Sequence, residues 1–125
     1  MEDKLNRIKE INIENGVWVI YIFIIIFSWI ANRKEKDYIL YEDERSKVEY
    51  QKLMILIFLV LVIIYYYFTK SSYEDVLNLN INDSSKKKKL TNLSFIGSML
   101  VLISGVIFLY IVISDDNIDT EVAFN

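Results

Sequence analysis

The sequence of 125 residues contains no cysteine, no histidine and no proline. Without cysteine and histidine the protein has no thiolate nucleophile, no imidazole base, no disulfide and few of the ligands that zinc, copper and haem sites use. Without proline, no helix carries the kink that often marks a gate or a binding site in transporters. We therefore expect no cofactor, and a protein that is not an enzyme.

Sequence motifs of other chemistries are missing as well. There is no glycine-rich phosphate-binding loop, no pair of carboxylates inside an apolar segment and no Ser/Lys dyad within membrane depth. In the acidic tail, Asp115, Asn117, Asp119 and Glu121 have the spacing of the first ligands of a calcium loop, but Thr120 stands where such a loop requires glycine. We therefore expect no metal site either.

The distribution of charge separates the chain into apolar runs and polar segments. The net charge of −3 gives no reason to expect nucleic acid binding, which normally requires a basic surface. The hydrophobic content of 54% exceeds the usual value for soluble domains, about 45 to 50%. Asp, Glu, Lys and Arg are absent from three runs: residues 16–31, 53–69 and 93–113. The sequence predicts an all-α integral membrane protein, a single domain with three transmembrane helices in sequential antiparallel arrangement.

The first apolar run, residues 16–31, has two alternative interpretations. Its β-branched and aromatic residues favour a strand by propensity, but buried strands are about 4 to 8 residues long and this run shows no alternation with polar residues. A cleaved signal peptide is disfavoured because acidic residues precede the run and a cut after Ala31 would place Trp29 where a small residue is needed. We therefore predict a membrane-spanning helix that stays in the mature protein.

The segment before the first run and the segment after it are both charged. Residues 1–15 place Leu5, Ile8 and Ile11 on one side of a short interfacial helix. The Asn15-Gly16 turn signal then either separates that helix from the first span or frays the first turn of the span.

Residues 32–52 form a charged connector with six basic and six acidic residues. Its pairs Asp43/Lys47 and Arg45/Glu49 have the i, i+4 spacing of a solvated helix. The second helix therefore either starts outside the membrane, or the connector is a loop that rests on the membrane surface; we favour the loop.

The remaining polar segments are residues 70–92 and the acidic tail, residues 114–125. Ser71/Glu74 and Ser72/Asp75 match the capping-box pattern and favour the start of a separate short helix. A loop and a run of four lysines follow, just before the third apolar run.

The third apolar run is the only one rich in small residues. They recur at intervals of three and four, which places them on one face of a helix, and small residues allow close approach of helices in lipid. We predict that this face packs against other membrane helices, and it consists of Ser94, Gly97, Ser98, Val101, Ser104 and Gly105.

The lysine run is the main basis for predicting orientation. Lysines at a helix N-terminus oppose the helix dipole, so their placement is better explained by retention at an anionic membrane surface. We predict that they anchor the topology or contact lipid headgroups: Lys86, Lys87, Lys88 and Lys89. The N-terminus would then be cytoplasmic and the C-terminus outside the cell membrane. Arg33, Lys34 and Lys36 argue for the opposite orientation.

The sequence restricts function mainly by elimination. The abundance of Ile, Lys, Asn and Tyr is typical of AT-rich bacterial genes. No span carries the ionisable residue that a proton path or ion path normally needs. We predict a non-enzymatic accessory or interaction subunit whose partners are the bilayer and other membrane helices, in a hetero-complex or a homo-oligomer. The alternatives are a self-assembling pore former, similar in size and number of spans to phage holins, and an immunity-type membrane protein.

Overall fold

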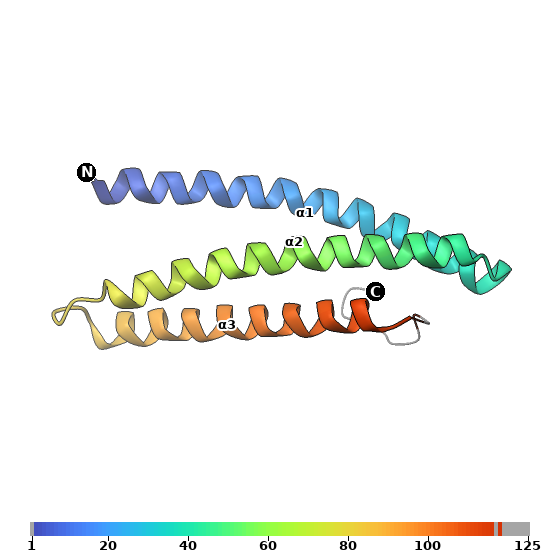
Figure 1. Ribbon diagram of the computed structural model, residues 1–125. Helices are drawn as coiled ribbons and strands as arrows, with labels where there is room; N and C mark the ends of the chain where they lie inside the picture. Colours follow the sequence, from blue (N-terminus) through green and yellow to red (C-terminus); the bar gives the residue numbers. More distant parts are fainter. Residues whose placement is uncertain (1, 117, 119–125) are drawn as a thin grey trace. The chain divides into compact units, whose positions relative to one another are not determined.

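The computed structural model describes residues 2–116 and residue 118. Within them the chain forms three helices, α1 (Glu2–Tyr41), α2 (Glu44–Leu77) and α3 (Ser85–Ser114), joined by short connections (Figure 1). Each helix is long and apolar enough to cross a membrane. The prediction of an all-α protein with three consecutive antiparallel spans is confirmed.

Helix α1 is continuous from the polar N-terminal segment through the first apolar run. The backbone stays helical at Asn15 and Gly16, so the turn signal does not separate an interfacial helix from the span. In the first turns, Arg7 forms ion pairs with Glu10 at 3.2 Å and with Glu14 at 3.5 Å, which support the helix before the apolar run. A single glycine in a long helix costs only about 1 kcal/mol, which the surrounding turns offset.

The charged connector is a helical hairpin with a two-residue turn, so the prediction of a surface loop is wrong. Glu42 adopts a φ of 52°, which ends α1, and its amide donates to the Tyr38 carbonyl at 2.8 Å. Asp43 then caps α2, because its carboxylate accepts from the Arg45 amide at 3.1 Å and from the Ser46 hydroxyl at 2.9 Å. These two bonds fix the turn and let α2 begin immediately.

The chain divides near Leu53 into two compact units. The first contains α1 and the start of α2. Its two helices are joined near the turn by an ion pair of 2.7 Å between Lys34 and Glu49, and by the Lys47 ammonium 5.5 Å from the centre of the Tyr38 ring. The predicted pair of Arg45 and Glu49 is also present, at 3.1 Å.

The second unit contains the rest of α2 and α3. Helix α2 runs on to Leu77, so the separate short helix predicted from the capping-box pattern does not form. Ser72, one of the predicted caps, instead uses its hydroxyl in a contact with Ser98 of α3. Ser84 caps α3, because its hydroxyl accepts from the Lys87 amide at 3.1 Å.

Most of the buried apolar side chains lie on α2. They recur at intervals of three and four along its apolar run, as expected for a helix that packs along one stripe. They are Met54, Ile57, Phe58, Leu61 and Ile64, each less than a tenth exposed.

Candidate functional site

The α3 surface that faces α2 is built around Gly105. A side chain at this position would place its Cβ 3.0 Å from the Tyr65 ring and 3.4 Å from the Val62 side chain. Gly105 is buried, and the absence of a side chain is what lets the Tyr65 ring lie against the α3 backbone. This is the close approach that small residues permit between helices in lipid.

Hydroxyl groups hold the same two helices together about two turns away. The Thr69 hydroxyl lies 3.0 Å from the Ser98 carbonyl oxygen of α3 and 2.7 Å from the Tyr65 carbonyl oxygen of its own helix. The Ser72 and Ser98 hydroxyl oxygens are 3.2 Å apart. Thr69 is buried, so its single hydroxyl hydrogen is shared between acceptors that water does not reach.

Two aromatic pairs complete the contact between α2 and α3. Phe58 and Phe108 have ring centroids 5.8 Å apart, and Tyr73 and Phe95 have centroids 5.4 Å apart. Both separations fall in the favourable range for aromatic pairs. These contacts and the hydroxyl contacts fit one antiparallel register, in which Thr69 lies level with Ser98.

This register fixes which parts of α2 and α3 share a depth in the membrane. The apolar run of α2 ends at Thr69, and Lys70 begins the polar end of that helix. Thr69 lies level with Ser98 of α3. Ser98 is five residues, or about 7 Å along the helix axis, after Leu93, the first residue of the predicted third span. The first turn and a half of the predicted third span therefore lies beside the polar end of α2.

The Lys86–Lys89 run lies further along α3, about 13 to 18 Å beyond the level of Thr69. Two of its members have partners near the loop. Lys87 forms an ion pair with Asp83 at 3.3 Å, and Lys88 donates to the Ile81 carbonyl at 3.0 Å.

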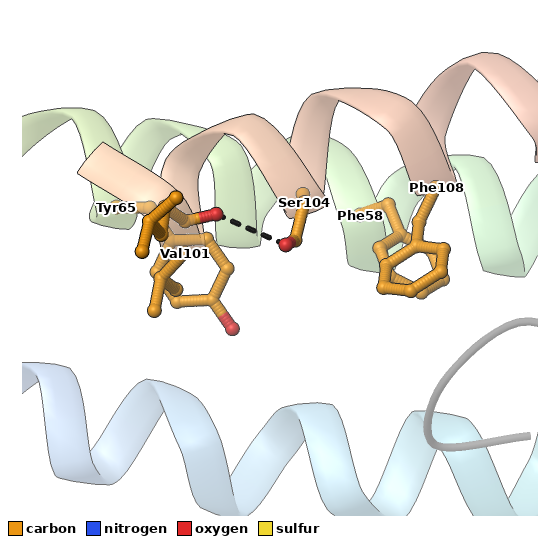
Figure 2. Close-up of a pocket in the computed structure, with 7 residues that line it drawn as sticks. Phe58, Tyr65, Val101, Ser104 and Phe108 are labelled. Carbon is orange, nitrogen blue, oxygen red and sulfur yellow. Dashed lines mark hydrogen bonds between the residues drawn. The ribbon is translucent and has the colours of Figure 1, made fainter. Parts of the chain in front are cut away.

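A shallow apolar groove of about 270 Å³ lies along the α2–α3 pair. Figure 2 shows the rings of Phe58 and Phe108 side by side in it, and Tyr65 beside Val101. The Ser104 hydroxyl donates to the Leu100 carbonyl of its own helix at 3.0 Å, so it offers the groove little polarity (Figure 2). The groove is lined by Phe58, Tyr65, Leu100, Val101, Ser104, Gly105 and Phe108.

The six small residues predicted as one packing face divide into two sets. Ser98 and Gly105 contact α2, as described above. The others lie on an adjacent side of α3 and are exposed: Ser94, Gly97, Val101 and Ser104. A Cβ at Gly97 would meet no atom within 4 Å, so nothing within the chain requires glycine there. We refer to Ser94, Gly97, Val101 and Ser104 as the open face of α3.

The polar hairpins at the ends of the helices hold their carboxylates in the charged form. The Lys34 ammonium, hydrogen-bonded to Glu49, holds the pKa of that carboxyl below its ordinary value, with a smaller contribution from Arg45. The Ser46 hydroxyl lowers the pKa of Asp43, and the Asn80 amide lowers the pKa of Asp83. These carboxylates cap and join helices.

The described residues contain no group of three or more His, Cys, Asp or Glu side chains arranged to hold a metal ion. Of the tail residues with calcium-loop spacing, Asn117, Asp119 and Glu121, and Thr120 between them, lie outside the described part of the chain.

Two features of this site were not predicted from the sequence. The groove was missed because its aromatic side chains come from different helices, and no signal within one helix relates Phe58 to Phe108. The register was missed for the same reason, although Thr69 and Ser72 at the end of an apolar run are the residue types that bond across helices in lipid. No protein-family model matches the chain, and no curated protein or solved structure matches it.

Proposed function

We propose that the protein is a non-enzymatic multi-pass membrane protein that acts as an accessory or interaction subunit, and that it binds a further membrane helix on the open face of α3. The observation that carries this proposal is the division of the small residues. Gly105 and Ser98 are used inside the chain, whereas a Cβ at Gly97 would meet no atom within 4 Å and Val101 is exposed at the groove.

The open face has the properties of a helix-packing surface in lipid. Association of helices in a bilayer depends on close van der Waals contact, because lipid chains are as apolar as leucine side chains and give no hydrophobic driving force. Gly97 removes the side chain that would hold a second backbone away. The adjoining apolar groove of about 270 Å³ gives room for larger side chains of a partner helix.

The proposal concerns the cell membrane, and it includes an orientation. The prediction of a cytoplasmic N-terminus depended on the lysine run lying at the membrane surface. The run lies about 13 to 18 Å beyond the level of Thr69 and four to seven residues before the third apolar run, which is within the roughly 15 to 20 residues over which basic residues count toward orientation. Arg33 and Lys52 lie within two residues of the ends of their apolar runs. Lys70 follows the second apolar run directly, on the side of the lysine run. We therefore propose that the N-terminus and the α2–α3 connection are cytoplasmic, with eight basic residues on that side against six on the other.

Photocrosslinking in native membranes tests the interaction proposal. A small diazirine-bearing amino acid is placed at Gly97, on the open face, or at Val106, which is exposed on the opposite side of α3. We expect the Gly97 derivative to give one defined protein adduct and the Val106 derivative to give lipid adducts. Gly97→Leu in the same membranes should lose the partner without loss of the protein itself.

The mass of the adduct separates the alternatives. An adduct with a different polypeptide supports an accessory subunit, and its identity gives the complex. An adduct with a second copy supports a homo-oligomer, and release of dye from vesicles that contain the purified protein then tests pore formation. Equal lipid labelling from both positions would reject the open face as an interaction surface.

A further inference from the structure

Basic residues surround the point where the α1–α2 hairpin leaves the apolar segments. Arg33, Lys34 and Lys36 follow within five residues of the end of the first apolar run at Ala31. Lys52 immediately precedes the second run. The three basic residues therefore lie on the first helix of the hairpin, α1, and Lys52 lies on the second, α2.

The hairpin geometry brings these residues to one level. The Lys34 ammonium lies 2.7 Å from the Glu49 carboxylate across the hairpin. Lys52 is three residues further toward its apolar run than Glu49, and Arg33 is one residue further toward its own run than Lys34. At 1.5 Å per residue, all the basic side chains start within a belt about 8 Å deep. The headgroup region on one side of a bilayer is about 5 to 8 Å deep.

Most of this charge is free to meet lipid. Lys34 is engaged by Glu49, but the side chains of Arg33, Lys36 and Lys52 are exposed. Among residues 2–116 and 118, no carboxylate forms an ion pair with any of these three. Lys47 is level with Lys36 and also belongs to the belt, and Glu35 and Glu49 are its acidic members, so the belt carries an excess of three positive charges.

An aromatic side chain lies at the membrane side of the same belt. Trp29 is about three-quarters exposed and lies one turn before Arg33, with Lys36 almost one turn further on the same face of α1. Tryptophan favours the boundary between hydrocarbon and headgroups. One face of α1 thus presents, in order, an indole for the acyl-glycerol boundary and two cations for the phosphate level.

We propose that Arg33 and Lys36, on the side of α1 turned away from α2, form a binding site for an anionic phospholipid headgroup, with Trp29 against the adjoining acyl chains. Lys52, at the same level on α2, supplies a cation for a neighbouring lipid. This inference depends on the membrane placement of the helices and is independent of the partner proposed for α3. The planar guanidinium of Arg33 can donate two hydrogen bonds to a phosphate diester. Lys36 and Lys52 supply ammonium charges to a second anionic oxygen and to a second lipid, respectively. The lysine run on α3 is a weaker competitor, because Lys87 is paired and the whole run lies beyond the headgroup level.

Fluorescence quenching by brominated lipids tests this site, because the chain has only two tryptophans. In the Trp18→Phe variant, Trp29 is the only reporter. The protein is reconstituted in phosphatidylcholine vesicles with 10 mol% brominated lipid, either brominated phosphatidylglycerol or brominated phosphatidylcholine. At about 1 kcal/mol per basic residue near the surface, one such contact per lipid already gives roughly fivefold enrichment of phosphatidylglycerol around Trp29, which we expect to see as excess quenching.

Matched variants identify the source of the preference. The triple variant Arg33→Gln, Lys36→Gln, Lys52→Gln should quench equally with both brominated lipids, whereas Lys86→Gln, Lys87→Gln, Lys89→Gln should keep the excess. The Trp29→Phe protein, which reports from Trp18, should show less preference for the anionic lipid.

Three outcomes would overturn the proposal. The first is equal quenching of Trp29 by both lipids in the Trp18→Phe protein. The second is an excess that survives the triple variant at Arg33, Lys36 and Lys52. The third is absence of quenching of either tryptophan by any brominated lipid, which would also overturn the membrane placement on which the proposal for α3 depends. The first two outcomes leave the proposal for α3 untouched.

Discussion

The two ends of α2 are joined to their neighbouring helices by different chemistry. Near its N-terminus, α2 is tied to α1 by charged groups, the Lys34–Glu49 ion pair and the Lys47 ammonium beside the Tyr38 ring. Near its C-terminus, α2 is tied to α3 by hydroxyl groups and aromatic rings. Charged pairs suit a hairpin that stands in water, whereas neutral hydroxyls cost less to dehydrate than charges and recover that cost through hydrogen bonds beside an apolar run.

The two hairpins also differ in how the apolar runs meet. In the first, Ala31 and Leu53 end their runs at the same level, with a charged belt directly outside. In the second, the run of α3 extends about 7 Å past the level where the run of α2 ends. Where the two apolar runs end at the same level, the boundary between hydrocarbon and headgroups is sharp. Where one run extends past the other, serine and threonine side chains lie between an apolar helix segment and a polar one.

The largest effect is expected from filling the close contact at Gly105. Gly105→Leu forces the Tyr65 ring away from α3, because even a Cβ would lie 3.0 Å from it. Overpacking of this kind costs about 1 to 3 kcal/mol. We expect a loss of about 2 kcal/mol in the free energy of unfolding, measured by reversible unfolding in mixed micelles.

Gly97→Leu is the matched control for that variant. Its side chain enters open space, so the free energy of unfolding should stay within about 0.5 kcal/mol of the parent value. Equal destabilisation by both leucines would show that α2 does not discriminate between the two sides of α3.

Removal of the hydroxyl contact should have a smaller effect. Thr69→Val keeps the shape of the side chain and removes its hydrogen bond to the Ser98 carbonyl. Hydrogen bonds between membrane helices contribute about 0.6 kcal/mol on average and at most about 1.7 kcal/mol. We expect a loss in this range in the same unfolding experiment.

Ser104→Ala serves as the comparison, because the Ser104 hydroxyl donates only to the Leu100 carbonyl of its own helix. That variant should leave the free energy of unfolding unchanged. A loss at Ser104 as large as the loss at Thr69 would argue against a specific bond across the helices.

The smallest effect is local and depends on pH. The pKa of Glu49 is lowered mainly by its hydrogen bond to Lys34, so the ion pair contributes fully above the ordinary value of 4.5 and is lost as pH falls through the lowered pKa. A spin label at Tyr41→Cys should therefore become more mobile below pH 4.5, while the α2–α3 hairpin is unaffected.

Lys34→Gln removes the partner that lowers this pKa. The label at Tyr41→Cys should then be mobile already at neutral pH, and most of the transition at low pH should disappear. A transition of unchanged size in the Lys34→Gln protein would assign the pH dependence to another carboxylate.

The sequence was sufficient to predict the number and type of the helices, because three long runs without Asp, Glu, Lys or Arg have few other stable forms in water or lipid. It was not sufficient for the connector. Its balanced charges were consistent with either a loop or a hairpin, and the capping bonds of Asp43 to Arg45 and Ser46 decided between them.

The packing prediction shows the same limit at the level of single residues. Ser94 and Ser98 are one helical turn apart, and periodicity alone places them on one side of α3. Which of them contacts α2 depends on the register of the pair, which is set by Tyr65 against Gly105 and by Thr69 against Ser98. The use of the other small residues as a packing face stays a prediction.

The measurement that tests the account most directly is the accessibility of single cysteines in sealed vesicles, which is clean because the chain has none of its own. Tyr41→Cys reports on the α1–α2 turn, and Asn80→Cys reports on the connection between α2 and α3. We expect an impermeant maleimide to reach these two positions from opposite sides of the membrane. Labelling of both positions from the same side would contradict the conclusion that α2 crosses the bilayer.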